Sequence, residues 1–104
     1  YEADELLFLF GLNKKLGPIL DWNIDLNGKK IKVNTENYQT SKEGIFAVGD
    51  INDYPGKLDL ILSGFHETTL AVQEAYKRIY PGERVPFGYT TSNSKLQEKL
   101  GVKK

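Results

Sequence analysis

The chain has 104 residues, with 14 basic and 14 acidic side chains, one histidine, no cysteine and no methionine. This balance gives no single-sign field that would favour a nucleic-acid partner, and the lack of cysteine excludes disulfides and thiolate metal sites within these residues. The longest apolar run, residues 6–10, is too short to span a bilayer and follows acidic residues, so we expect neither a membrane segment nor a signal peptide. Because no initiating Met opens the sequence, we expect an excised piece of a longer chain.

The first third of the chain predicts a strand, a connection and a hairpin. Residues 6–10 are continuously apolar and are closed by Gly11, which indicates a strand covered on both faces. Residues 13–18 collect charge, glycine and proline, so they are our best candidate for an exposed crossing between domains. Residues 23–34 alternate apolar and polar side chains around Asn27-Gly28, and this pattern predicts an antiparallel hairpin with one buried face.

The remaining elements follow a second apolar run. Residues 44–48 place four apolar side chains after a glycine and before Gly49, which predicts a buried parallel strand. After a turn at 53–56, apolar residues spaced by three and four predict an amphipathic helix over 63–80. We expect Ser63 to cap that helix, followed by an aromatic loop over 86–93 and a short helix over 94–100.

Gly49 and Asp50 are the first candidate binding residues. They end the predicted parallel strand, and open α/β sheets hold ligands at the carboxyl ends of their strands. Gly49 would let a ligand approach the backbone, and Asp50 could accept a hydrogen bond from a ribose or ribityl hydroxyl. The alternative is an ordinary strand end followed by an Asx turn.

Several motifs together resemble a known family. Thr-Ser at 40–41 followed by Gly-Ile-Phe-Ala-Val-Gly-Asp at 44–50 resembles the second FAD-binding motif of flavoproteins with two dinucleotide-binding domains, the group that contains thioredoxin reductase. Tyr-Pro-Gly-Lys-Leu at 54–58, Ile-Leu-Ser-Gly-Phe-His-Glu at 61–67 and Tyr-Thr-Thr-Ser at 89–92 are similar to the thioredoxin-reductase-like ferredoxin/flavodoxin–NADP+ reductases. The resemblance covers essentially the whole chain.

The resemblance implies an α/β fold, the C-terminal part of a Rossmann-like FAD/NAD(P)-binding domain with a β-hairpin, a buried parallel strand, a long helix and a short C-terminal helix. It implies that residues 1–16 are the last strand of an NADPH-binding domain and the crossover, 17–85 the C-terminal part of the FAD-binding domain, and 86–104 a tail covering the flavin. No Gly-x-Gly-x-x-Gly follows a predicted strand, so neither pyrophosphate site is expected here and the segment alone is expected to be inactive.

The family's cofactor contacts map onto three groups of residues. The resemblance implies that Asp50, beside Gly49, binds the FAD ribityl chain, and that Tyr89 covers one face of the flavin with two hydroxyls near its reactive edge. The start of the long helix would line the isoalloxazine and favour the negative charge of reduced flavin. The implied lining residues are Leu60, Ile61, Leu62, Ser63 and Gly64, and the two hydroxyls are those of Thr90 and Thr91. The alternatives are an ordinary helix cap at Ser63 and a Tyr89 packed on its own domain.

The remaining chemistry-bearing residues predict no reaction of their own. Neither a catalytic side chain nor a metal site is expected, and the single histidine, His66, is read as locally hydrogen-bonded in preference to a proton relay. For Tyr54 and Lys57 we expect a solvated turn, with contact to a cofactor or partner as the alternative.

By resemblance, the full-length protein is an FAD-dependent oxidoreductase that moves electrons between NADPH and ferredoxin or flavodoxin. The family further implies a cytoplasmic homodimer. Two alternatives stay open: a segment of a thioredoxin or other disulfide reductase whose redox cysteines lie elsewhere, and a non-catalytic interaction domain.

Overall fold

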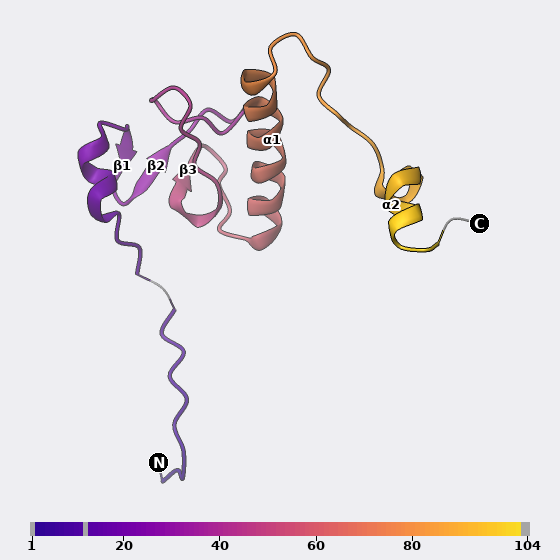
Figure 1. Cartoon of the computed structure of the whole chain (residues 1–104). Helices are drawn as coiled ribbons and strands as arrows, with labels where there is room; N and C mark the ends of the chain where they lie inside the picture. Colours follow the sequence, from indigo (N-terminus) through magenta and orange to yellow (C-terminus); the bar gives the residue numbers. More distant parts are fainter. Residues whose placement is uncertain (1, 12, 103–104) are drawn as a thin grey trace.

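The structure is a computed structural model that describes residues 2–11 and 13–102. Strand β1 (Leu26–Asn27) pairs antiparallel with β2 (Lys30–Lys32), and β2 pairs in parallel with β3 (Asn52–Asp53). The sheet is therefore small and mixed, with the order β1-β2-β3. Helix α1 (Ile61–Ile79) lies beside the β3 side of this sheet (Figure 1). The chain is thus an α/β segment, as its sequence predicts.

Three short 3₁₀ helices connect or extend these elements. The first, η1 (Gly17–Trp22), precedes the hairpin, and the second, η2 (Gly49–Ile51), leads directly into β3 and packs against α1. The third, η3 (Thr90–Ser92), precedes helix α2 (Ser94–Lys99) in the C-terminal tail. The core lies between the hairpin and the segment before η2. Its buried cluster is formed by Leu16, Ile24, Ile31 and Ala47.

The predicted hairpin is confirmed, but its turn is one residue later than the Asn-Gly pattern suggests. Leu26 lies opposite Ile31 and Asn27 lies opposite Lys30, so Asn27 is paired in the strand and the two turn residues are Gly28 and Lys29. Gly28 has a φ of +59°, and a glycine with positive φ at the first turn position is typical of a type II′ hairpin. The glycine of the motif therefore determines the turn.

The predicted buried strand over residues 6–10 is wrong for this structure. These five side chains are 66–88% exposed and their backbone forms no strand. In Figure 1 the run extends away from the sheet as an arm. A strand needs a neighbour for its backbone N–H and C=O groups, and no segment of the described chain lies beside this one to provide it.

The predicted parallel strand over residues 44–48 is also wrong. Its segment folds back antiparallel on the residues just before it, through an isolated bridge between Gln39 and Phe46. The Thr40 N–H donates to the Ile45 carbonyl at 2.9 Å, and the Ala47 N–H donates to the Tyr38 carbonyl at 3.1 Å. The backbone groups of this segment are therefore used in a local antiparallel turn and are not available to a parallel neighbour. The parallel partner of β2 is β3 instead.

Helix α1 is confirmed, although it begins two residues before the predicted start and Ser63 is not its cap. The capping position is Leu60, which offers no side-chain acceptor, and the helix ends at Ile79, just before the Pro81-Gly82 signal. On the predicted apolar face only Ala71 is buried among the apolar residues, while Phe65 and Val72 are 71% and 61% exposed. Much of that face is therefore uncovered in this chain.

The tail after α1 is extended up to its short terminal helix. Residues 84–89 form no regular structure, and α2 begins after Asn93, whose side chain accepts a hydrogen bond from the Leu96 N–H at 3.1 Å. The predicted short helix is thus confirmed, one residue shorter than expected at its end. The tail leads away from α1 (Figure 1). In the part of the chain described, no helix is long and apolar enough to cross a membrane.

Candidate functional site

The predicted binding residues of η2 and α1 lie at one edge of the molecule. A Cβ added to Gly64, in the first turn of α1, would lie 3.6 Å from the Cα of Gly49, so the helix start lies close beside the Gly-Asp turn. Asp50 is exposed beside this contact, and Ser63 is half-buried. The structure therefore brings the Gly-Asp turn and the helix start together. The flanking apolar residues are also exposed, by 52%, 81% and 76% for Leu60, Ile61 and Leu62.

The Gly-Asp turn is not the Asx turn that the sequence left as an alternative. Gly49 has a φ of +78°, a conformation that side chains other than glycine rarely adopt. In the described part of the chain, the carboxylate of Asp50 accepts no hydrogen bond, whereas an Asx turn requires one from a nearby backbone N–H. This carboxylate therefore has its full acceptor capacity free at the surface.

A buried carboxylate holds this turn against the helix. Glu67, in the second turn of α1, is fully buried. Its Oε2 accepts from the Gly49 N–H at 2.7 Å and from Asn52 Nδ2 at 2.8 Å. Its Oε1 accepts from the Tyr54 hydroxyl at 2.9 Å and from Lys57 Nζ, which also forms a salt bridge with it. Both carboxylate oxygens are thus satisfied by two donors each.

Lys57 completes the contact with Gly49 from the other side. Its side chain is only 3% exposed, and its Nζ donates to the Gly49 carbonyl at 2.9 Å as well as to Glu67. The N–H of Gly49 thus donates to the Glu67 carboxylate, and the C=O of Gly49 accepts from the Lys57 ammonium group. The expectation of a solvated turn at Tyr54 and Lys57 is therefore wrong: the backbone turn exists, but both side chains point into the protein.

Asn52 is the remaining member of this cluster and is fully buried. Its Nδ2 donates to the Ala47 carbonyl at 3.0 Å and to Glu67. Because two acceptors face the amide nitrogen, the orientation of the amide is determined. Its Oδ1 is the one buried side-chain oxygen or nitrogen in the described chain that has no hydrogen-bond partner.

The network changes the pKa values of two of its members. Burial pushes the pKa of Glu67 up, but hydrogen bonds from Lys57, from the Gly49 N–H and from Tyr54 outweigh it, and the pKa lies below its ordinary value. Burial, followed by the hydrogen bond to Glu67, raises the pKa of the Tyr54 hydroxyl well above its ordinary value. Glu67 is therefore an anion and Tyr54 a neutral donor at neutral pH.

Sequence reasoning missed Glu67 as an organising residue, although a signal for it exists. Glu67 lies four residues before Ala71, so it is on the buried face of the helix. A carboxylate on such a face requires a cation or several donors. Lys57, on the turn before the helix, is the cation that the sequence offers nearby.

The tail residues are not brought to this edge. Tyr89 is 73% exposed, and its ring contacts Phe87 edge-on at 6.1 Å between centroids. Thr90 and Thr91 are exposed in η3, on the segment that leads away from α1 (Figure 1). Their role at a flavin stays a prediction. The alternative of a Tyr89 packed on its own domain is not seen either.

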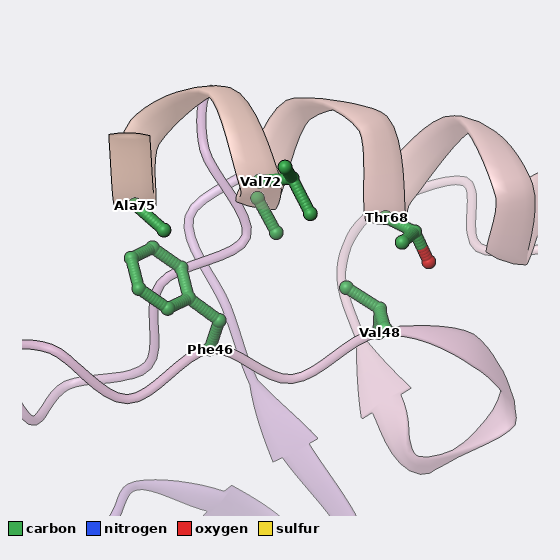
Figure 2. A pocket seen from close by; sticks show the side chains of 6 residues that line it. Phe46, Val48, Thr68, Val72 and Ala75 are labelled. Atoms are coloured by element: carbon green, nitrogen blue, oxygen red, sulfur yellow. The ribbon is translucent and has the colours of Figure 1, made fainter. Parts of the chain in front are cut away.

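A second surface is an apolar pocket of about 220 Å³ between α1 and the segment before η2. Figure 2 shows Phe46 and Val48 facing the helix side chains across it. The hydroxyl of Thr68, its only polar lining group, donates to the Gly64 carbonyl at 2.7 Å. This pocket therefore offers packing area and no reactive group. Its lining residues are Phe46, Val48, Thr68, Ala71, Val72 and Ala75.

A surface ion cluster connects the loop before α1 to two earlier segments. Asp59 binds Lys30 of β2 at 2.8 Å and Lys14 at 3.2 Å. The hydrogen bond from Lys30, then that from Lys14, lowers the pKa of Asp59. The same pair raises the pKa of Lys30. Within the described ranges, no three His, Asp or Glu side chains gather closely enough to hold a metal ion.

A small mixed sheet, a long helix and a glycine-carboxylate turn at the start of that helix define an α/β segment, and the exposed edge at this turn is its candidate binding site. No family model matches the chain. It is 57% identical over 100 residues to a ferredoxin–NADP reductase from Beijerinckia indica, 60% over 97 residues to one from Mesorhizobium japonicum, and 54% over 103 residues to one from Pelagibacter ubique. These alignments cover 96%, 93% and 99% of this chain.

The relatives are much longer than the chain. The alignments cover 29%, 28% and 30% of the three proteins, so the chain spans less than a third of the curated relatives it matches. The chain is a segment of a protein of the ferredoxin–NADP reductase family.

Proposed function

We propose that the intact protein is an FAD-dependent oxidoreductase that passes electrons between NADPH and a ferredoxin or flavodoxin. The observation that carries this proposal is the Gly49–Asp50 turn, fixed against the first turn of α1 with a free carboxylate at the surface. The relatives named ferredoxin–NADP reductase support it over a disulfide reductase or a non-catalytic interaction domain.

The residues present at this edge fit FAD. Asp50 offers an exposed acceptor for the hydroxyls of the ribityl chain, and the neighbouring Gly49 and Gly64 leave the space between η2 and the start of α1 without side chains of their own. When bound, the flavin accepts a hydride from the nicotinamide and releases single electrons. The protein segment supplies binding and orientation at this edge.

The start of α1 is suited to the isoalloxazine. No side chain caps it, so N–H groups of its first turn remain available together with the positive end of the helix dipole. These groups favour negative charge on the reduced flavin. We assign the exposed Leu60, Ile61 and Leu62 to the apolar lining of the ring, with Ser63 and Gly64 closest to its polar edge.

The tail would cover the other face of the flavin. Tyr89 is exposed and available for stacking. Thr90 and Thr91, which follow it, are also exposed and carry the two hydroxyl groups. In this segment the tail leads away from α1 (Figure 1). For Tyr89 to stack on the flavin, the tail must take a different position in the intact enzyme.

We further assign residues 1–16 to the last strand of an NADPH-binding domain and its crossover, 17–85 to the C-terminal part of a Rossmann-like FAD-binding domain, and 86–104 to the tail. Residues 1, 12, 103 and 104 of these ranges lie outside the described residues. A cytoplasmic homodimer is proposed from the family resemblance. The uncovered apolar run at 6–10 and the uncovered part of α1 support burial against further protein.

The test uses the full-length protein. We expect a flavin absorption spectrum that NADPH bleaches, and re-oxidation by ferredoxin or flavodoxin. Asp50→Ala should raise the Kd for FAD about tenfold or more, because a hydrogen bond to a charged group contributes about 1.5–3 kcal/mol. Asp21→Ala, an exposed acidic residue on η1, is the matched control and should change nothing. Absence of FAD binding, or preferential transfer to a thioredoxin disulfide, would contradict the proposal.

A further inference from the structure

The backbone of Gly49 is bound at both of its polar groups by one buried ion pair. Its N–H donates to Glu67 at 2.7 Å, and its carbonyl accepts from Lys57 at 2.9 Å. The two side chains come from α1 and from the loop before it, and they also bind each other. Asp50, the proposed ribityl ligand, is the next residue. The pair therefore acts on the backbone that orients this carboxylate.

Within the turn itself, one backbone hydrogen bond is formed, from the Asn52 N–H to the Gly49 carbonyl that Lys57 also binds. The turn consists of three residues of 3₁₀ helix, and a glycine with a φ of +78° begins it. Glycine has more conformational freedom than any other residue, so an unconstrained glycine at this point would leave Asp50 free to reorient. Hydrogen bonds to ionised groups are the strong ones, and here two of them hold one peptide segment.

The pair is unusual in its burial. Glu67 is 0% exposed and Lys57 is 3% exposed at the side chain. Buried ion pairs are often no more stabilising than a neutral, well-packed pair, whereas removing one partner alone is strongly destabilising. Their presence is better explained by the geometry they impose on the turn than by stability.

We propose that Glu67 and Lys57 are positioning residues for the cofactor: as an ion pair they hold the Gly49 peptide groups so that Asp50 faces the ribityl chain. This inference rests on the proposed function. Tyr54 and Asn52 hold the carboxylate in place, because each donates to one of its oxygens. The two sequence segments that set the chain's resemblance to this reductase branch, at 54–58 and 61–67, are thus joined physically by this pair.

The decisive variants are Lys57→Met, Glu67→Gln and the double variant in the full-length protein. Lys57→Met leaves the Glu67 carboxylate buried without its cation, so its pKa rises. Tyr54 and the amide of Asn52 are the neutral groups that bind it, and the charged residues of η2 and β3 are two further carboxylates, Asp50 and Asp53. Neither can replace the cation.

For Lys57→Met we expect a weaker affinity for FAD at pH 7, about tenfold or more. The Kd of Lys57→Met should also depend on pH, whereas that of wild type should not. As the pH rises and the unpaired Glu67 ionises, the Kd of this variant should increase by up to about tenfold per pH unit. The double variant has no buried charge, so its Kd should be independent of pH and closer to that of wild type than the Lys57→Met value. Lys77→Met, which removes an exposed cation of α1, is the control and should leave the Kd unchanged.

A second measurement does not depend on FAD. Hydrogen exchange of the apoprotein, read on peptides covering residues 44–52, should be faster in both single variants than in wild type and unchanged in Lys77→Met. If wild type binds FAD but the Kd of Lys57→Met is unchanged and independent of pH, the inference is overturned while the proposed function stands. If wild type binds no FAD, the proposed FAD-dependent function is contradicted. If hydrogen exchange over residues 44–52 is then also equal in wild type and all variants, the positioning role of Glu67 and Lys57 is overturned as well.

Discussion

Gly64 lies close beside Gly49: a Cβ on Gly64 would lie 3.6 Å from the Gly49 Cα. This separation is an ordinary van der Waals distance, so an alanine at position 64 would fit without pushing the helix start and the Gly-Asp turn apart. With glycine at both positions, the space between them is free of side chains. We propose that the edge of the flavin approaches the backbone there.

Gly64→Ala separates packing from ligand binding. In the helix, alanine should stabilise the apoprotein by up to about 0.5–1 kcal/mol, because glycine loses more backbone entropy on folding. The added methyl group should weaken FAD binding, because it occupies the surface that we assign to the isoalloxazine. Thermal unfolding of the apoprotein and FAD titration measure the two effects. Lys77→Ala, exposed on the same helix, is the control. Equal FAD affinity in wild type and Gly64→Ala would contradict the assignment.

Gly49→Ala should act through the backbone alone. No atom lies within 4 Å of an added Cβ at this position, but the φ of +78° is strained for alanine. We expect a loss of about 1–2 kcal/mol in the free energy of unfolding. Gly88→Ala, equally open but without a positive φ, should lose almost nothing. Urea denaturation of the two apoproteins compares them, and equal midpoints would show that the turn is not strained by a side chain.

The elements predicted correctly are those whose signals are local. The Gly28 hairpin and helix α1 follow from residues close in sequence, and each appears within two residues of its expected position. The runs at 6–10 and 44–48 carry only the information that they are apolar. Whether such a run becomes a strand depends on a neighbouring strand, and that is a property of the fold.

The site was predicted in part for the same reason. Gly49 and Asp50 were recognised from a contiguous motif, and the structure brings them to the start of α1. The turn at Lys57 was also recognised, but turn chemistry says nothing about side-chain burial. The sequence indicates only that a carboxylate on the buried face of α1 needs a cation; that Lys57 also binds the Gly49 carbonyl depends on how α1 packs against η2.

Asp59 should make part of the stability depend on acid pH. The hydrogen bond from Lys30, then that from Lys14, lowers the pKa of its carboxyl below the ordinary value of 3.8. A folded-state pKa below the unfolded one gives stability that is present above pH 3.8 and is lost as the pH falls through the lowered value. The difference in apoprotein unfolding midpoint between wild type and Asp59→Asn should therefore shrink from pH 6 to pH 3. It should also shrink in high salt, because the cluster is partly exposed.

The control for this prediction is Asp21→Asn, an exposed residue outside the ion pairs of the described chain. Its midpoint should follow that of wild type over the same pH range. An Asp59→Asn variant that also follows wild type at every pH would show that the cluster contributes nothing to stability.

Tyr89 should affect the flavin and leave folding unchanged. Its side chain is 73% exposed and its ring contacts that of Phe87, which is 77% exposed, so truncating either ring removes little buried area. Tyr89→Ala in the full-length enzyme should therefore keep the unfolding midpoint of wild type. Loss of a ring stacked on the isoalloxazine should shift the flavin absorption bands and change the rate of turnover with NADPH.

Phe87→Ala is the matched control, because it removes a neighbouring ring of similar exposure that we do not place on the flavin. We expect its spectrum and turnover to equal those of wild type. If Tyr89→Ala and Phe87→Ala behave alike in both measurements, the tail acts as a unit or not at all, and a specific stacking role for Tyr89 is excluded. A spectral change confined to Tyr89→Ala requires the exposed tail of this segment to fold onto the flavin in the intact enzyme.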